Sequence, residues 1–145
     1  MSGHYRGFTL VELMVTIAVA AILLSVGVPS LKSLYDGYRV KSEISRIEQT
    51  LAFARNQAIS YGMGVSVAKN GANWSDGLRV FVTSSDKTLK VVDGFSSHDV
   101  VTGADVTFQA DGLSSGEATF TYCNNSSDCK GVKVSSSGMI RYTDS

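Results

Sequence analysis

Few residues of this 145-residue chain have the chemistry of a catalytic or metal site. The two histidines, His4 and His98, lie far apart in the sequence, and neither belongs to a catalytic or metal-binding motif. No nucleophile elbow, zinc-protease motif, phosphate-binding loop or dinucleotide fingerprint is present. Aspartates that stand in turn-like contexts, where Asp stabilises turns, are Asp76, Asp86, Asp93, Asp99, Asp105 and Asp111. We therefore expect no enzyme, no cofactor and no metal site, and we expect both histidines to be exposed.

Glu12 is the acidic residue with the most unusual setting, because it lies inside a long apolar segment. From Phe8 to Val28, 16 of 21 residues are apolar. At about 1.5 Å per residue a helix of this length spans roughly 31 Å, the thickness of a bilayer core. A carboxylate there costs on the order of 3 kcal/mol. Glu12 therefore either lies near the membrane surface or needs a positive partner at the start of the helix.

The flanks of this segment favour a membrane anchor that stays in the mature protein. The polar leader that precedes it carries Arg6, and a basic flank predicts a cytoplasmic N-terminus. No small-residue cleavage site closes the run, as one would in a secretory signal. The run instead passes through Pro29 into a helical pattern.

The residues Gly7-Phe8-Thr9-Leu10-Val11-Glu12 resemble the class III signal of type IV pilins and pseudopilins. The resemblance implies that a prepilin peptidase cleaves after Gly7 on the cytoplasmic side and that the new N-terminal residue, Phe8, is N-methylated. It also implies that Glu12 pairs with the N-terminal amine of a neighbouring subunit and fixes the register of assembly. Pro29 falls where pilins commonly carry a proline that kinks the helix.

An amphipathic helical pattern follows Pro29. Its apolar positions recur mostly at steps of three, four or seven, and they are Leu31, Leu34, Tyr38, Ile44, Ile47, Leu51, Ala54 and Ala58. Glycines from Gly62 onward predict the end of the helix. We expect one helix over residues 8–60, with this apolar face packed on the protein's own sheet.

From Gly64 the hydrophobic period becomes two, which is typical of strands. Six or seven short, mostly antiparallel strands are expected over residues 65–68, 78–82, 89–92, 106–109, 118–122, 132–134 and 139–142. The predicted fold class is α+β: a long N-terminal helix, transmembrane in its first half, packed on a mostly antiparallel sheet in a pilin fold. Trp74 is expected to pack against this sheet.

Motifs from the end of the predicted helix onward resemble the GspH/FimT-type pilins. They are Arg55-x-x-Ala58, Trp74-x-x-Gly77-x-x-Val80-Phe81, Thr119-Phe120-Thr121-Tyr122-Cys123, Val132-Lys133-Val134-Ser135 and Ser137-Gly138. The predicted organisation is a prepilin leader (1–7), a transmembrane and filament-core helix (8–28), its amphipathic continuation (29–61) and a β-rich globular domain (62–145).

Cys123 and Cys129 enclose a loop of five residues. Once the helix is anchored, the domain faces the periplasm or the exterior, where cysteines oxidise. We expect a disulfide; two free thiols are the alternative. A zinc site is not expected, because further ligands are missing.

Basic residues near the C-terminus raise the question of DNA contact. Lys130, Lys133 and Arg141 could cluster if the last two strands pair; the alternative is that they are ordinary solvated strand residues. Some FimT-type pilins bind DNA through a Gly-Arg-x-Arg motif, whereas this chain has Gly138-Met139-Ile140-Arg141, in which only Arg141 matches. The net charge of zero, from 13 basic and 13 acidic residues, also argues against a general nucleic-acid binder.

The sequence is therefore identified as a minor pilin or pseudopilin of the GspH/FimT-like family. The resemblance implies a minor pilin that initiates or caps a type IV pilus; the alternatives are a minor pseudopilin of the type II secretion system and a DNA-binding pilin for natural transformation. Expected partners are the prepilin peptidase, other minor pilins, the major pilin or pseudopilins, and the inner membrane. We expect a single span in the bacterial inner membrane, with the globular domain periplasmic, before transfer to a filament.

Overall fold

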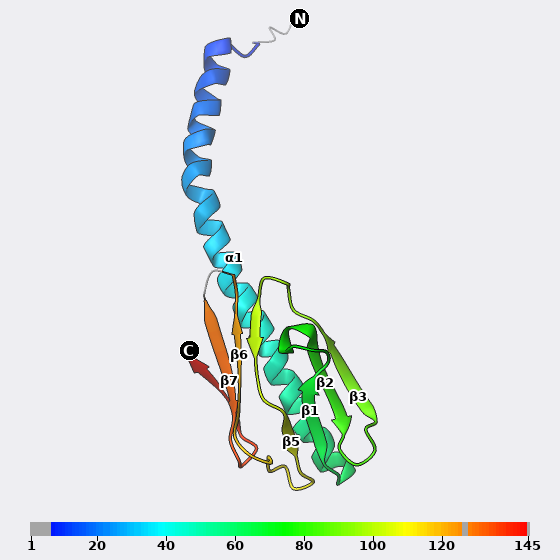
Figure 1. The fold of residues 1–145 in the computed structure, drawn as a ribbon. Coiled ribbons are helices and arrows are strands. Elements are labelled where there is room, and N and C mark those ends of the chain that lie inside the picture. The colour runs from blue at the N-terminus through cyan, green and yellow to red at the C-terminus, as the bar shows by residue number, and fades with distance from the viewer. Residues whose placement is uncertain (1–6, 126–127, 145) are drawn as a thin grey trace, which may run out of the picture. The chain divides into compact units, whose positions relative to one another are not determined.

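The computed structural model describes residues 7–125 and 128–144 (Figure 1). These residues form one long α-helix, one short 3-10 helix and eight β-strands. They divide into two compact units, one extending to Tyr35 and the other starting at Asp36. The helix α1 (Leu10–Tyr61) contributes to both units.

In the first unit α1 is a solvent-exposed apolar helix. Thr9 starts it as the N-cap, because its Oγ1 accepts a hydrogen bond from the backbone N–H of Glu12 at 3.2 Å. Every residue from Gly7 to Tyr35 is exposed. The apolar stretch is long enough to cross a membrane, by length and composition. The helix begins two residues later than Phe8, where the sequence placed its start, and continues through Pro29 as expected.

At its other end α1 closes on a glycine. Gly62 has φ of +63°, a conformation that glycine adopts without a steric penalty. The backbone N–H of Met63 donates to the carbonyl of Ala58 at 3.2 Å, and that of Gly62 donates to Ile59 at 3.4 Å. This pair of bonds is a Schellman motif, which satisfies the last carbonyls of the helix.

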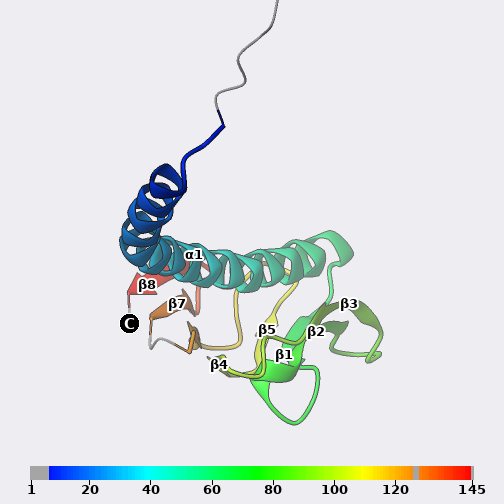
Figure 2. The same ribbon diagram turned by 90° about the horizontal axis from the view of Figure 1, so that it is seen from above.

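The eight strands form two four-stranded antiparallel sheets. Sheet A has the order β3-β2-β1-β5 and sheet B the order β4-β6-β7-β8. Sheet A consists of β1 (Val65–Lys69), β2 (Gly77–Val82), β3 (Thr88–Asp93) and β5 (Val106–Phe108), and the 3-10 helix η1 (Trp74–Asp76) precedes β2. Sheet B consists of β4 (Val100–Thr102), β6 (Ala118–Cys123), β7 (Cys129–Val134) and β8 (Ile140–Asp144). Both sheets lie on one side of the C-terminal half of α1 (Figure 2).

The expected number of strands, six or seven, is wrong because β4 went unrecognised. β4 has only three residues, Val100–Thr102, so it is too short to show alternation. It pairs with β6 in sheet B, whereas the next strand, β5, pairs with β1 in sheet A. The strands therefore divide between two sheets, which the hydrophobic pattern alone did not indicate.

One face of the second half of α1 packs on the sheets. Its buried apolar residues are Val40, Ile44, Ile47, Leu51, Ala54 and Ala58. The predicted face is correct from Ile44 onward. It is wrong for Leu31, Leu34 and Tyr38, which are exposed because burial of α1 by the domain begins only at Val40.

The core between helix and sheets is built around large aromatic side chains. Phe108, Phe120 and Tyr122 are fully buried. Trp74 is half-buried and meets Phe120 edge-on, with ring centroids 5.3 Å apart. The packing role expected of Trp74 is present, and the contact joins η1 to sheet B.

Candidate functional site

The N-terminal segment places the expected processing residues at an accessible helix start. Gly7 and Phe8 precede the first helical residue, and the Phe8 side chain is 75% exposed. Gly7, Phe8, Thr9 and Glu12 line a shallow, open depression of about 440 Å³. The peptide bond between Gly7 and Phe8 therefore lies outside the helix, next to an exposed side chain.

Glu12 occupies the first turn of α1, three residues after its N-cap. A carboxylate there interacts favourably with the positive end of the helix dipole. Among residues 7–125 and 128–144 Glu12 forms no ion pair, so its charge is available to a group outside this chain. Sequence reasoning overlooked the capping role of Thr9, although Thr-x-x-Glu is the spacing of a capping box.

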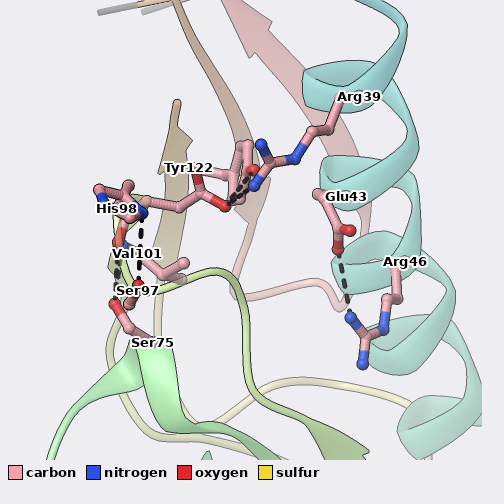
Figure 3. Close-up of polar contacts among 9 residues, drawn as sticks. Arg39, Glu43, Arg46, Ser75, Ser97, His98, Val101 and Tyr122 are labelled. Carbon is pink, nitrogen blue, oxygen red and sulfur yellow. Dashed lines mark hydrogen bonds and ion pairs between the residues drawn. The ribbon is translucent and has the colours of Figure 1, made fainter. Parts of the chain in front are cut away.

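A buried polar cluster, which sequence reasoning missed, joins α1 to the domain (Figure 3). We call Arg39, Asp99 and Tyr122 the Asp99 cluster. Arg39 from α1 donates to Asp99 Oδ2, and the Tyr122 hydroxyl from β6 donates to the same oxygen at 2.8 Å. The Asp99 side chain is only 1% exposed, whereas that of Arg39 is 33% exposed. The sequence placed Asp99 among turn aspartates, and no local pattern marks it as an ion-pair residue.

The environment of Asp99 also changes the acidity of Tyr122. Burial raises the pKa of the Tyr122 phenol, and the hydrogen bond to Asp99 raises it further. Asp99 Oδ1 is buried and has no hydrogen-bond partner among the residues that the structure describes. A buried carboxylate in this position depends strongly on the two donors that it has.

Arg46 makes a second connection between α1 and the segment that precedes Asp99. Its guanidinium donates to the Asp93 carbonyl at 2.7 Å and lies 5.3 Å from the centre of the Phe95 ring. It also pairs with Glu43 on the same helix at 3.2 Å (Figure 3). The Phe95 ring in turn lies 5.7 Å from that of Tyr122. Residues 93–99 are thus fastened to two successive parts of the helix.

Arg55, one of the motif residues, fastens the far end of α1. Its Nε donates to the Gly112 carbonyl at 3.0 Å. Gly138 has φ of +75°, and a Cβ added there would lie 2.0 Å from the same carbonyl. This close approach explains why glycine occupies position 138 after the Ser-rich turn.

The three basic residues considered for DNA contact are only partly brought together. Lys133 and Arg141 are cross-strand neighbours on β7 and β8. Lys130 lies three positions before Lys133 on β7, so it projects from the opposite face of the sheet. Lys133 is also paired with Glu117 at 2.7 Å. The structure therefore brings together two of the three cations, Lys133 and Arg141, and not all three.

The structure also bears on the predictions made for the cysteines and histidines. Cys123 and Cys129 form a disulfide between the paired ends of β6 and β7, as expected. His98 is exposed, and His4 lies outside the described residues. Within the described part of the chain, no group of three or more His, Cys, Asp or Glu side chains is placed to hold a metal ion.

Two sequence-family models match the chain. The model of the type II transport protein GspH matches residues 43–138. The model of the prokaryotic N-terminal methylation motif matches residues 3–28, which include Glu12. No curated protein sequence matches significantly.

Solved structures similar to the chain include a minor pilin and a minor pseudopilin. The type IV minor pilin FimU of Pseudomonas aeruginosa is 23% identical with a TM-score of 0.66, over 76% of this chain and 92% of that one. A second crystal form of FimU gives 24% identity and a TM-score of 0.62, over 71% and 91%. The minor pseudopilin EpsH from the type 2 secretion system of Vibrio cholerae is 12% identical with a TM-score of 0.58, over 72% and 96%. Identities this low establish a shared fold, the pilin fold that the sequence predicted.

Proposed function

Because the chain belongs to the GspH family of type II transport proteins, we propose that it is a minor pilin that initiates or caps a type IV pilus. The N-terminal methylation motif carries this proposal, because its residues 10–28 form an apolar helix in which every residue is exposed. Such a motif implies processing by a prepilin peptidase and assembly with other pilins or pseudopilins.

The chemistry proposed for the N-terminal segment follows from its match to the N-terminal methylation motif and from its resemblance to the pilin signal. Cleavage after Gly7 creates a positive amine at Phe8, which becomes N-methylated. In the filament the amine of one subunit meets Glu12 of a neighbour, which compensates the carboxylate within an apolar helix bundle. Because a charge in such a bundle is costly without a partner, the pair selects one axial register.

The proposed topology follows from the same segment. Residues 1–7 form the cytoplasmic leader and 8–28 cross the inner membrane. The continuation 29–61 links this span to a periplasmic globular domain, 62–145. After extraction, residues 8–28 pack in the filament core, with Pro29 as the proposed kink.

A minor pseudopilin of the type II secretion system is the second candidate. The fold similarity to EpsH and the match to the family of the type II transport protein GspH favour it. FimU supports the pilus assignment in the same way, with the higher TM-score. The two candidates differ in the machine that takes up the subunit, so a genetic experiment separates them.

The experiment is a clean deletion strain whose sheared surface filaments are probed by immunoblot for the major pilin. The proposal expects filaments to disappear and to return on complementation, with secretion through the type II system unchanged. Normal filaments together with a secretion defect would instead identify a pseudopilin. Normal filaments and normal secretion would contradict both assignments.

A further inference from the structure

Arg39 lies on the first turn of α1 that packs against the domain. Val40 is the first buried residue of the helix, and Arg39 immediately precedes it. Every residue from Gly7 to Tyr35 is exposed. A pull applied at the N-terminal end of the helix therefore reaches the contacts with the domain first around Arg39 and Val40.

We propose that the Asp99 cluster is a mechanical clamp, which resists peeling of α1 from the domain when force is applied through the N-terminal end of the helix. The proposal rests on the proposed function in one respect: a subunit held by its N-terminal helix experiences such force during extraction and in the filament. The clamp itself is a property of the folded chain.

The clamp joins the helix to a strand rather than to a loop alone. Asp99 Oδ2 accepts hydrogen bonds from both the Arg39 guanidinium and the Tyr122 hydroxyl, and Tyr122 belongs to β6. β6 pairs with β4 on one side and with β7 on the other, so force on Arg39 is transmitted into sheet B. Ser75 Oγ lies 3.4 Å from the Asp99 carbonyl and connects the same point to η1.

The chemistry of the cluster suits this role better than aliphatic packing. Separating Arg39 from Asp99 removes the ion-pair partner of a carboxylate that is 1% exposed. Its other oxygen has no partner in the described part of the chain, so little compensates the charge as the contact opens. Contacts of this kind fail over a short distance, whereas the aliphatic face from Ile44 to Ala58 separates gradually.

Single-molecule force spectroscopy on the full chain tests the clamp. The chain is held in a detergent micelle, with a handle attached through a peptide tag at each terminus. The rate of the first opening step is measured at constant force. We expect Arg39→Met to raise this rate at least tenfold. Tyr122→Phe, which keeps the buried ring and removes one hydrogen bond, is expected to raise it about threefold or more.

Two control variants separate a clamp from ordinary stabilisation. Tyr142→Phe removes an exposed hydroxyl that lies 3.5 Å from Glu48, and is expected to leave the rate unchanged. Leu51→Ala weakens the core beyond the first buried turns, so it should lower Tm at least as much as Tyr122→Phe and change the first step less than twofold. Equal rates of the first opening step for Tyr122→Phe and Tyr142→Phe would overturn the clamp. So would opening rates that rank all four variants in the order of their Tm values. Because the chain is measured alone, failure here leaves the deletion experiment unaffected.

Discussion

At the scale of single residues, the two carboxylates that matter most have opposite surroundings. Glu12 is exposed at a helix start and forms no ion pair in the described part of the chain, whereas Asp99 is buried and held by two donors. We propose a partner for Glu12 outside the chain, whereas the partners of Asp99 lie within the fold. The distinction leads to different expectations for removing each charge.

Replacing Glu12 by alanine is expected to leave cleavage intact and to abolish incorporation into filaments. The reason is that the proposed cleavage after Gly7 does not use the carboxylate, whereas the proposed axial register of assembly does. The measurement is an immunoblot of membranes, for processing, and of sheared filaments, for incorporation, with Thr16→Ala as control. Wild-type amounts of the Glu12 variant in filaments would refute the register argument.

Removing Arg39 is expected to lower the free energy of unfolding more than removing the charge of Asp99. Arg39→Met leaves a buried charge uncompensated and should lower the free energy of unfolding by about 2–4 kcal/mol. Asp99→Asn should cost less, because a partly exposed guanidinium is still hydrated. The control is Arg79→Met, at a pair with Asp86 on the surface, with an expected loss of at most about 1 kcal/mol. Urea unfolding measures all three, and equal losses for Arg39→Met and Arg79→Met would contradict the role of burial.

Alkaline pH should destabilise the domain partly through Tyr122. Its folded-state pKa is raised by burial and by the hydrogen bond to Asp99, so folding favours the neutral phenol. This contribution is complete below the ordinary tyrosine pKa of about 10 and is lost as pH rises above it towards the folded-state value. The urea midpoint should therefore decline less steeply above pH ~10 in Tyr122→Phe than in Tyr142→Phe. Parallel declines would show that Tyr122 does not contribute.

At the scale of elements, local pattern predicted most of the architecture and missed what depends on contacts distant in sequence. The helix pattern from Ile44 to Ala58 and the alternation of β6 mark their buried faces directly. β4 is too short to carry a pattern, and its pairing with β6 arises only in three dimensions. Asp99 was missed for the same reason, since its partners lie 60 and 23 residues away. The N-terminal methylation motif could be recognised from the sequence because its residues are contiguous.

Gly77, at the start of β2, has a conformation and surroundings that only glycine satisfies. Its φ is +111°, and an added Cβ would lie 2.1 Å from the Val92 carbonyl. We expect Gly77→Ala to lower the free energy of unfolding by more than about 2 kcal/mol. Gly116→Ala is the matched control, because nothing lies within 4 Å of its added Cβ. Thermal unfolding monitored by circular dichroism compares the two variants. Similar Tm values would show that β2 and β3 can move apart enough to accommodate the added Cβ.

At the scale of the whole molecule, the two units are suited to different surroundings. The exposed apolar helix up to Tyr35 requires a membrane or other helices, whereas the unit from Asp36 buries its own core. We expect the full chain to remain in membranes after extraction at alkaline pH. A chain beginning at Pro29 should be recovered in the aqueous fraction with Tm within a few degrees of that of the full chain. Recovery of the shortened chain in membranes would show that a second surface also binds lipid.

The interleaving of the two sheets governs how the domain can come apart. The chain passes from β3 in sheet A to β4 in sheet B, returns to β5 in sheet A, and then continues with β6 in sheet B. Neither sheet is thus made from one uninterrupted stretch, because β4 comes between two strands of sheet A in the chain and β5 comes between two strands of sheet B. Partial unfolding in which one sheet unfolds while the other stays folded is therefore disfavoured. A protease should encounter either the complete domain or an open chain, and a digestion time course should show intact domain and small peptides, with no persistent half-sized fragment.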